Sequence, residues 1–269
     1  MQRRKRRGKK PRSALNKKIK PIQNSVQPHV SVVIPAMNER RTISRVIYEA
    51  SKVHGSTEVI VVANGSRDGT DRLAAAMGAK TLFFAEPLGH DVGRAIGAKH
   101  AQGNIVLFLD GDVVIPAKHL VPLVRAVEAG ADVALNKYIG PVNRKKVHSV
   151  ILAKHALNMM LSRPDLKGVS LTTIPHAMSR KAISMIGVEH LTVPPLAHSI
   201  AIHKGLKVVD AHYIEVGRTN PIKRKKRSGK DPLESLIVGD HLEAVHWLAS
   251  HTNERGNFTD LGRDRKRVR

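Results

Sequence analysis

The sequence predicts an α/β protein built around a mostly parallel β-sheet with helices on its faces. Short apolar runs alternate about four times with segments of helical spacing, a pattern typical of parallel sheets. Four of the five runs are apolar at nearly every position, so we expect strands buried on both faces. The 269 residues and the 41% apolar content suffice for one domain with a large core.

Each element follows from a local pattern. The apolar runs predict strands over Val30–Ala36, Glu58–Ala63, Lys80–Phe84, Asn104–Asp110 and Ala131–Asn136. Helical spacing predicts helices over Arg41–Lys52, Thr70–Met77, Asp91–Ala101 and Ala117–Glu128. The second half predicts helices over Lys146–Leu161, Arg180–Ile186 and Leu196–Lys204, a strand at Lys207–Val216, and an amphipathic helix from Pro232 to about Ser250.

The charge is unevenly distributed along the chain. The net charge is +24, and residues 1–20 contribute 11 Lys and Arg side chains and no acid. We therefore predict a disordered basic arm over 1–28, a folded domain over 29–217, and over 218–269 a basic linker, the amphipathic helix and a tail. Such an arm suits an anionic membrane surface or a nucleic acid.

Cysteine usage and hydropathy exclude several classes of protein. The chain has no cysteine, so any metal would be held by oxygen or imidazole ligands. No apolar run approaches the roughly 20 residues of a spanning helix, because polar residues interrupt the best candidate, Val147–Leu161. The basic start also lacks the apolar stretch of a signal peptide. We expect a cytoplasmic protein whose membrane contact, through the arm, is peripheral at the inner face.

An Asp-Gly-Asp sequence follows the fourth strand. In an extended chain Asp110 and Asp112 point the same way, and Gly111 leaves room for a ligand beside the backbone. Paired carboxylates suit Mg²⁺ or Mn²⁺ that is also bound by a substrate phosphate. A polar turn is the alternative.

Three further segments have both a structural and a functional interpretation. Polar residues follow the first strand (Pro35–Glu39) and the second (Asn64–Thr70), where open sheets bind ligands, although both segments also suit helix starts. Gly89, Gly93 and Gly97 recur every four residues beside Arg94. This spacing indicates either close helix packing or, through Arg94, a phosphate contact.

Taken together, these segments resemble the opening of a family 2 glycosyltransferase of the GT-A (Rossmann-like) fold. The matching stretches are Val32–Glu39, Val61–Thr70 and Phe108–Asp112, within residues 30–135. The resemblance implies a sugar transferase that uses a nucleotide-sugar donor. It implies donor contacts from Pro35, Ala36, Asn38, Glu39, Ala63, Asn64, Gly65, Ser66, Asp68, Arg94, Asp110 and Gly111, and metal ligation by Asp110, Asp112 and the late His212.

The chain also departs from that family. Ala63 stands where members usually carry an aspartate that touches the base. Inverting members have an acidic base some 80–100 residues after the metal motif, whereas residues 192–200 contain no carboxylate. Three explanations remain open. Glu189 or His198 is the base; the acceptor is already ionised, as a polyprenyl phosphate is; or the enzyme retains configuration, as Ser179-Arg180 and residues 205–221 suggest.

The sequence does not identify the acceptor. Aromatic residues make up only 3% of the chain, so few rings are available to stack on sugars, which favours a phosphate-bearing or lipid-linked acceptor. The family's Gln-x-x-Arg-Trp element is absent, which indicates a non-processive enzyme. The alternatives are a nucleic-acid-binding protein that acts through its arm, or a degenerate relative that binds nucleotide without turnover.

Overall fold

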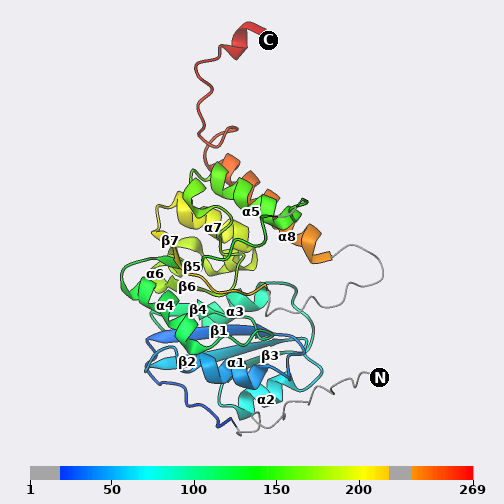
Figure 1. Ribbon diagram of the computed structural model, residues 1–269, viewed down its shortest axis with the longest axis vertical. Helices are drawn as coiled ribbons and strands as arrows, with labels where there is room; N and C mark the ends of the chain where they lie inside the picture. The colour runs from blue at the N-terminus through cyan, green and yellow to red at the C-terminus, as the bar shows by residue number, and fades with distance from the viewer. Residues whose placement is uncertain (1–18, 144, 218–231, 269) are drawn as a thin grey trace, which may run out of the picture.

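One mixed β-sheet runs through the centre of the molecule (Figure 1). The computed structural model describes residues 19–143, 145–217 and 232–268. The sheet order is β3-β2-β1-β4-β6-β5-β7. The strands are β1 (Val30–Ala36), β2 (Thr57–Asn64), β3 (Lys80–Phe84), β4 (Ile105–Phe108), β5 (Val133–Asn136), β6 (His176–Ser179) and β7 (Val208–His212). The predicted α/β class is confirmed.

Helices cover both faces of the sheet. They are α1 (Ile43–Ala50), α2 (Thr70–Ala76), α3 (Val92–His100), α4 (Ala117–Glu128), α5 (Ser149–Met160), α6 (Arg180–Ile186), α7 (Pro194–His203) and α8 (Pro232–His251). Short 3-10 turns are η1 (Pro164–Leu166), η2 (Val188–Thr192) and η3 (Arg265–Val268). Buried residues of α1, α2 and α4 form the core on one face, and those of α3 and α5–α8 form it on the other.

Strand β6 is absent from the elements predicted above. Its four residues, His176–Ser179, include no β-branched side chain, so they carry no strand signal. It lies antiparallel between β4 and β5, and its first residue, His176, pairs with Phe108 at the end of β4. The segment just before β6 therefore lies at the same edge of the sheet as the residues just after β4.

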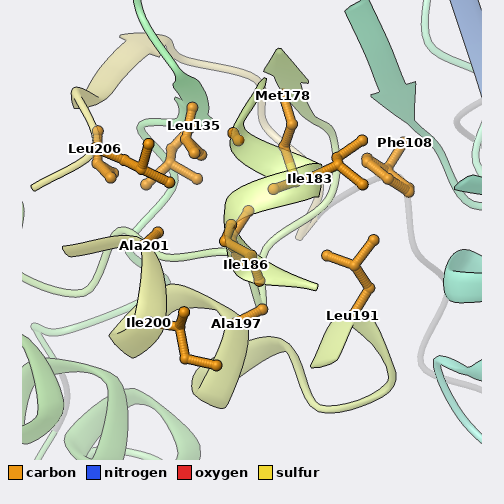
Figure 2. Close-up of a cluster of buried hydrophobic side chains, with 14 of the residues drawn as sticks. Phe108, Leu135, Met178, Ile183, Ile186, Leu191, Ala197, Ile200, Ala201 and Leu206 are labelled. Carbon is orange, nitrogen blue, oxygen red and sulfur yellow. The ribbon is translucent and has the colours of Figure 1, made fainter. Parts of the chain in front are cut away.

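The core on the α6 and α7 face is formed by aliphatic side chains (Figure 2). Phe108, Leu135 and Met178 extend from the sheet toward Ile183 of α6 and Ala201 of α7, and all five are 8% exposed or less. Strands and helices contribute to one continuous cluster, which fixes the second half of the chain against the first.

Small residues allow α3 to lie very close to β1. A methyl group on Gly97 would lie 2.2 Å from Cγ1 of Val33, and one on Gly93 would lie 3.1 Å from Cβ of Pro35. The glycine spacing in this helix is thus explained by close packing. The approach also places the first turn of α3, with Arg94, next to the end of β1.

Part of the predicted arm, residues 19–28, belongs to the folded domain. Residues 1–18 lie outside the described residues, but residues 19–28 run along the domain. The amide of Ile22 donates to the carbonyl of Met77, and the side chain of Asn24 exchanges two hydrogen bonds with the backbone of Val59. The prediction of disorder is wrong for 19–28, because these bonds satisfy the backbone despite the prolines.

Helix α8 belongs to the main body. Ala244 and Leu248 are buried in the core, and the helix packs against α5 and α7. Its other apolar residues include Leu236 and Leu242, which are 45% and 66% exposed. The linker over 218–231 lies outside the described residues, and the segment after α8 extends away from the body (Figure 1). In the described ranges no helix is long and apolar enough to cross a bilayer.

Candidate active site

Three loops meet at the carboxyl edge of the sheet. β1 lies between β2 and β4 and is parallel to both, so Ala36, Asn64 and the segment after Phe108 are at the same edge. All the predicted donor-binding residues except Arg94 lie on these strand ends and loops, and Arg94 reaches them from α3. The expectation that three strand ends converge on one place is confirmed.

The loops after β1 and β2 are joined by hydrogen bonds. Ser66 Oγ accepts from the amide of Asn38 (3.1 Å), and Asn38 Oδ1 accepts from the amide of Arg67 (2.9 Å). Thr70 Oγ1 donates to Asp68 Oδ1 (2.5 Å) and accepts from the amide of Glu39 (2.9 Å). The two predicted segments therefore form one structural unit.

Asp68 is ionised, and its carboxylate accepts the hydrogen bonds that stabilise this unit. Partial burial opposes ionisation, but hydrogen bonds from Thr70 and from the amide of Arg40 outweigh it and lower the pKa of Asp68. Asp68 also accepts from the amide of Thr70 at the start of α2, as an N-terminal acid does. The helix-start interpretation of this segment is thus correct, and it is compatible with a role in ligand binding.

Asn64 and Gly65, at the end of β2, contact the loop that follows β3. Asn64 Nδ2 donates to the carbonyl of Gly89 (3.0 Å), and its Oδ1 accepts from the amide of Leu88 (2.5 Å). Gly65 has a positive φ of 68°, and a methyl group there would lie 2.8 Å from Cγ of Pro87. Ala63 is fully buried at the end of β2. These residues shape the wall of the site.

The Asp-Gly-Asp segment is pressed against the end of β1. A methyl group on Gly111 would lie 3.0 Å from Cβ of Ala36, and the carbonyl of Gly111 accepts a hydrogen bond from Thr42 Oγ1 (2.7 Å). The side chain of Asp110 is 39% exposed, so one carboxylate of the pair is accessible to a ligand. Two carboxylates on a fixed backbone fit a hard divalent cation that keeps open positions.

Arg94 is buried and bound to two carboxylates. Its Nη2 donates to Asp110 Oδ1 (3.1 Å), and its Nη1 pairs with Asp91. Burial disfavours the guanidinium, but the charges of Asp110 and Asp91 outweigh it and raise the pKa of Arg94. In this arrangement Arg94 positions Asp110. Its buried Nε has no hydrogen-bond partner among the described residues, and a phosphate contact through Arg94 stays a prediction.

Asp91 and His90 are site residues that the sequence reasoning missed. His90 Nδ1 lies 2.6 Å from Asp91 Oδ2, and this hydrogen bond outweighs burial and raises the pKa of His90. The spacing of Asp91 three residues before Arg94 on a helix was the available signal. Burial and the charge of Asp91 raise the pKa of Asp240 on α8.

His212 is the last residue of β7, which runs in the same direction as β4, because β6 is antiparallel to both β4 and β5 and β7 is parallel to β5. Its ring stacks on His119 of α4, with centroids 5.9 Å apart. Among the described residues, the only group of three with ligand atoms within 4.8 Å of one another is His29, His54 and Glu128, near the opposite edge of the sheet. That group is accounted for by a His29–Glu128 ion pair (3.3 Å) and by His54 Nδ1, which accepts from the Ser56 amide. Nε2 of His212 is buried and has no hydrogen-bond partner among the described residues, and His212 as a third ligand stays a prediction.

The two candidate bases lie on α7 and η2. His198 is 0% exposed inside α7, and its Nε2 donates to Asn158 Oδ1 (2.8 Å). Burial lowers its pKa to about 3, so it cannot take a proton from an acceptor, and this interpretation is wrong. Glu189 lies on η2 with its side chain 70% exposed and paired with His190 (3.6 Å). The sequence could not reveal that Asn158 would be the partner of His198.

The buried histidines predict how stability depends on pH. Burial holds the pKa of His198 and of His176 at about 3 in the folded chain, whereas the ordinary value is 6.5. Between these values the unfolded chain binds more protons, so stability falls as the pH drops below 6.5. Each histidine contributes a slope of up to about 1.4 kcal/mol per pH unit.

Urea unfolding of the wild type and of His198→Gln between about pH 7 and about pH 4 measures this slope. We expect the acid-side slope to be shallower in the variant, since one titrating group is removed. His251→Gln, at an exposed position, is the matched control. Equal slopes for wild type and His198→Gln would contradict the assignment.

A buried lysine adds a cationic group that the sequence reasoning also missed. Lys154 of α5 is 6% exposed, and its Nζ donates to Thr173 Oγ1 (2.6 Å). Burial lowers its pKa to about 8. Thr173 lies three residues before His176, so this pair is next to the edge that carries Asp110. In the same loop, buried hydroxyls of Ser170 and Thr172 have no partner among the described residues.

The fold and the carboxyl-edge site together define a GT-A-type protein. Residues 31–183 match the sequence profile of glycosyl transferase family 2, which is more than half of the chain. The chain therefore belongs to glycosyl transferase family 2.

Curated relatives are similar over part of their length. A dolichol-phosphate mannosyltransferase of Pyrococcus furiosus is 22% identical over 235 residues, 84% of this chain and 65% of the relative. A glucosyl-3-phosphoglycerate synthase of Mycobacterium tuberculosis is 35% identical over 138 residues, 46% of this chain and 42% of the relative. The chain thus spans less than two thirds of the length of these relatives.

Solved structures support the fold. A crystal structure of the Mycobacterium tuberculosis glucosyl-3-phosphoglycerate synthase, in complex with Mn²⁺, uridine diphosphate and glucosyl-3-phosphoglycerate, has a TM-score of 0.57 at 21% identity. The match covers 87% of this chain and 82% of that one. This likeness extends beyond the family profile into the second half of the chain, which includes β6, β7 and α8.

Proposed function

We propose that this protein is a metal-dependent glycosyltransferase that moves a sugar from a nucleotide-sugar donor to a phosphate-bearing acceptor. One observation carries the proposal: in a family 2 chain, Asp110 and Asp112 lie at the same sheet edge as the joined loops after β1 and β2. Relatives named as sugar transferases, and a structural neighbour crystallised with Mn²⁺ and uridine diphosphate, support it.

Each part of the site has a role in this proposal. The unit formed by residues 36–40 and 64–70 would hold the nucleoside, because hydrogen bonds fix it before any ligand arrives. Asp110 and Asp112 would hold Mg²⁺ or Mn²⁺, and the chemistry supplied there is Lewis-acid stabilisation of the departing diphosphate. Arg94 orients Asp110, and Asp91 balances the buried guanidinium charge.

The acceptor side is formed by the second half of the chain. Lys154 and the Ser170–Thr173 loop offer a cation and hydroxyl donors close to the metal edge, which suits an anionic group such as a phosphate. An acceptor that is already ionised needs no base, which agrees with the burial of His198. A polyprenyl phosphate and a small phosphorylated acid both fit this chemistry, as the names of the relatives do.

The first test is thermal stabilisation by nucleoside diphosphates and nucleotide sugars, with and without Mn²⁺. A ligand at about one hundred times its Kd should stabilise the fold by about 2.7 kcal/mol. We expect one base to be preferred and its effect to depend on Mn²⁺. If no nucleotide shifts the melting temperature, the transferase proposal fails, and nucleic-acid binding by the arm becomes the leading alternative.

Transfer to the acceptor is tested separately. Sugar transfer from the preferred donor to 3-phosphoglycerate and to a short polyprenyl phosphate is compared for the wild type and Lys154→Met. This substitution removes the buried charge with little change in volume. We expect the nucleotide-induced shift to persist and the KM for acceptor to rise at least tenfold, about the effect of losing one charged hydrogen bond. An unchanged KM would place the acceptor elsewhere.

A further inference from the structure

The outer face of α5 is apolar. Its exposed residues are Leu152, Ala156, Met159 and Met160, which follow the i, i+4, i+7, i+8 spacing of one helical stripe. Leu152 and Met159 are 56% and 58% exposed. A surface helix of a water-soluble domain usually shows the opposite arrangement, with polar residues outside.

The inner face of the same helix is correspondingly polar. It carries Lys154 and Asn158, which are 6% and 1% exposed and hydrogen-bonded to the loop between η1 and β6. These bonds fix the rotation of α5 about its axis. The apolar stripe is therefore held outward by the packing of the helix and cannot turn into the core without breaking them.

The neighbouring helix extends this surface. α8 packs against α5, and Ser149 at the start of α5 donates to Glu234 of α8 (2.5 Å). Leu236 and Leu242 of α8 are 45% and 66% exposed. Six of the fourteen large exposed apolar side chains in the described part of the chain thus belong to these two helices. Both lie at the end of the molecule opposite β3 and α2 (Figure 1).

The chain segment that contains α5 is positively charged, and the acids of the surface lie on α8. Between Asp132 and Asp165 the sequence contains six Lys and Arg and no acid. Lys145 and Lys146, just before α5, are exposed, and so is Lys167 after it. Glu234, which reaches the start of α5, is held by Ser149 and His148. The exposed acid of this surface is Glu243, next to Leu242 on α8, so the positive charge lies on the α5 side.

We propose that this outer surface, formed by the exposed residues of α5 with Lys145, Lys146 and the exposed leucines of α8, docks onto an anionic lipid bilayer. Apolar side chains beside lysines are the composition of helices that lie in a membrane interface. A nucleic acid offers no site for Leu and Met side chains. The inference does not depend on the proposed transfer reaction.

The lack of cysteine allows a position-specific test. The single-cysteine variants Leu152→Cys and Phe83→Cys of the full chain each carry one environment-sensitive fluorophore, since the natural chain offers no other thiol. Phe83 on β3 is 55% exposed and distant, so it is the matched control. With vesicles of phosphatidylcholine and phosphatidylglycerol, we expect a blue shift at position 152 and none at 83.

A sedimentation assay with the same vesicles measures affinity. Replacing Leu152 and Met159 together by Gln should lower the partition coefficient roughly tenfold or more, and the Lys145→Glu, Lys146→Glu variant should lower it as well. Phe83→Gln should leave it unchanged. The Mn²⁺ and nucleotide shift of each variant shows that its fold and donor site are intact, so failure here is distinct from failure of the transferase proposal.

Three results would overturn the inference. The first is equal blue shifts at positions 152 and 83. The second is vesicle binding unaffected by the Leu152 and Met159 substitutions, which would assign lipid binding to the basic arm alone. The third is a blue shift at position 152 without vesicles that grows with protein concentration, which would make the surface an interface between two copies.

Discussion

Replacing Asp112 by alanine is expected to lower kcat/KM for sugar transfer by about a thousandfold, the scale of losing a central electrostatic contact to the departing group. The physical reason is that one of two carboxylates would be lost from the proposed cation site, whose backbone is fixed by Gly111 against Ala36. The Mn²⁺-dependent part of the nucleotide shift should disappear. The melting temperature without ligand should change little, because removal of one carboxylate also relieves repulsion from Asp110.

The control for this variant is Asp71→Asn in the first turn of α2, an acid outside the proposed site. It should retain full activity and the Mn²⁺-dependent shift. Initial rates over a range of Mn²⁺ concentrations, with the preferred donor, measure the effect. If Asp112→Ala keeps wild-type kcat/KM and the same Mn²⁺ dependence, Asp112 does not bind the metal and the proposed site is wrong.

The second large effect is expected at Gly97. An alanine in the middle of a helix normally gains about 0.5–1 kcal/mol over glycine. At Gly97 the new methyl group would lie 2.2 Å from Cγ1 and 3.3 Å from Cβ of Val33, which is fully buried in β1. Rotation of Val33 cannot move its Cβ, so α3 must shift away from β1. We expect a loss of about 2 kcal/mol in the free energy of unfolding.

Gly239→Ala on α8 is the matched control, because a methyl group there meets nothing within 4 Å. Its free energy of unfolding should rise, because alanine favours the helix more than glycine does. Chemical unfolding of both variants gives the comparison. A Gly97→Ala protein as stable as Gly239→Ala would mean that the contact between α3 and β1 is looser than described. The placement of Arg94 against Asp110, which depends on that contact, would then be wrong as well.

The donor half of the site could be predicted from the sequence for a simple reason. Parallel strands end at the same edge, so the polar segments after β1, β2 and β4 had to meet once the strands were identified. The second half lacks this regularity. β6 has no strand signal, and the partners of Lys154 and His198, namely Thr173 and Asn158, are 19 and 40 residues away in the sequence.

The surroundings of the candidate base and of the candidate third ligand could not be predicted for the same reason. His198 and His212 are residue types suited to catalysis and metal binding, but their roles depend on which helix packs against them. In the folded chain one is bonded to Asn158 and the other stacks on His119. Residues 19–28 were expected to be disordered from composition, and the bonds to Met77 and Val59 that order them come from strands and helices far along the chain.

The reversed direction of β6 has a consequence for how this enzyme could diversify. Because β6 runs against β4, the chain of the second half returns to the metal edge from outside the first half, and the loop that carries Thr173 is delivered there without being threaded between the donor loops. In the proposed reaction, substitutions in that loop and in α5 would change which molecule receives the sugar while the nucleotide side stays intact. The architecture would then separate the evolution of acceptor choice from that of donor use, as two interchangeable parts of one catalyst.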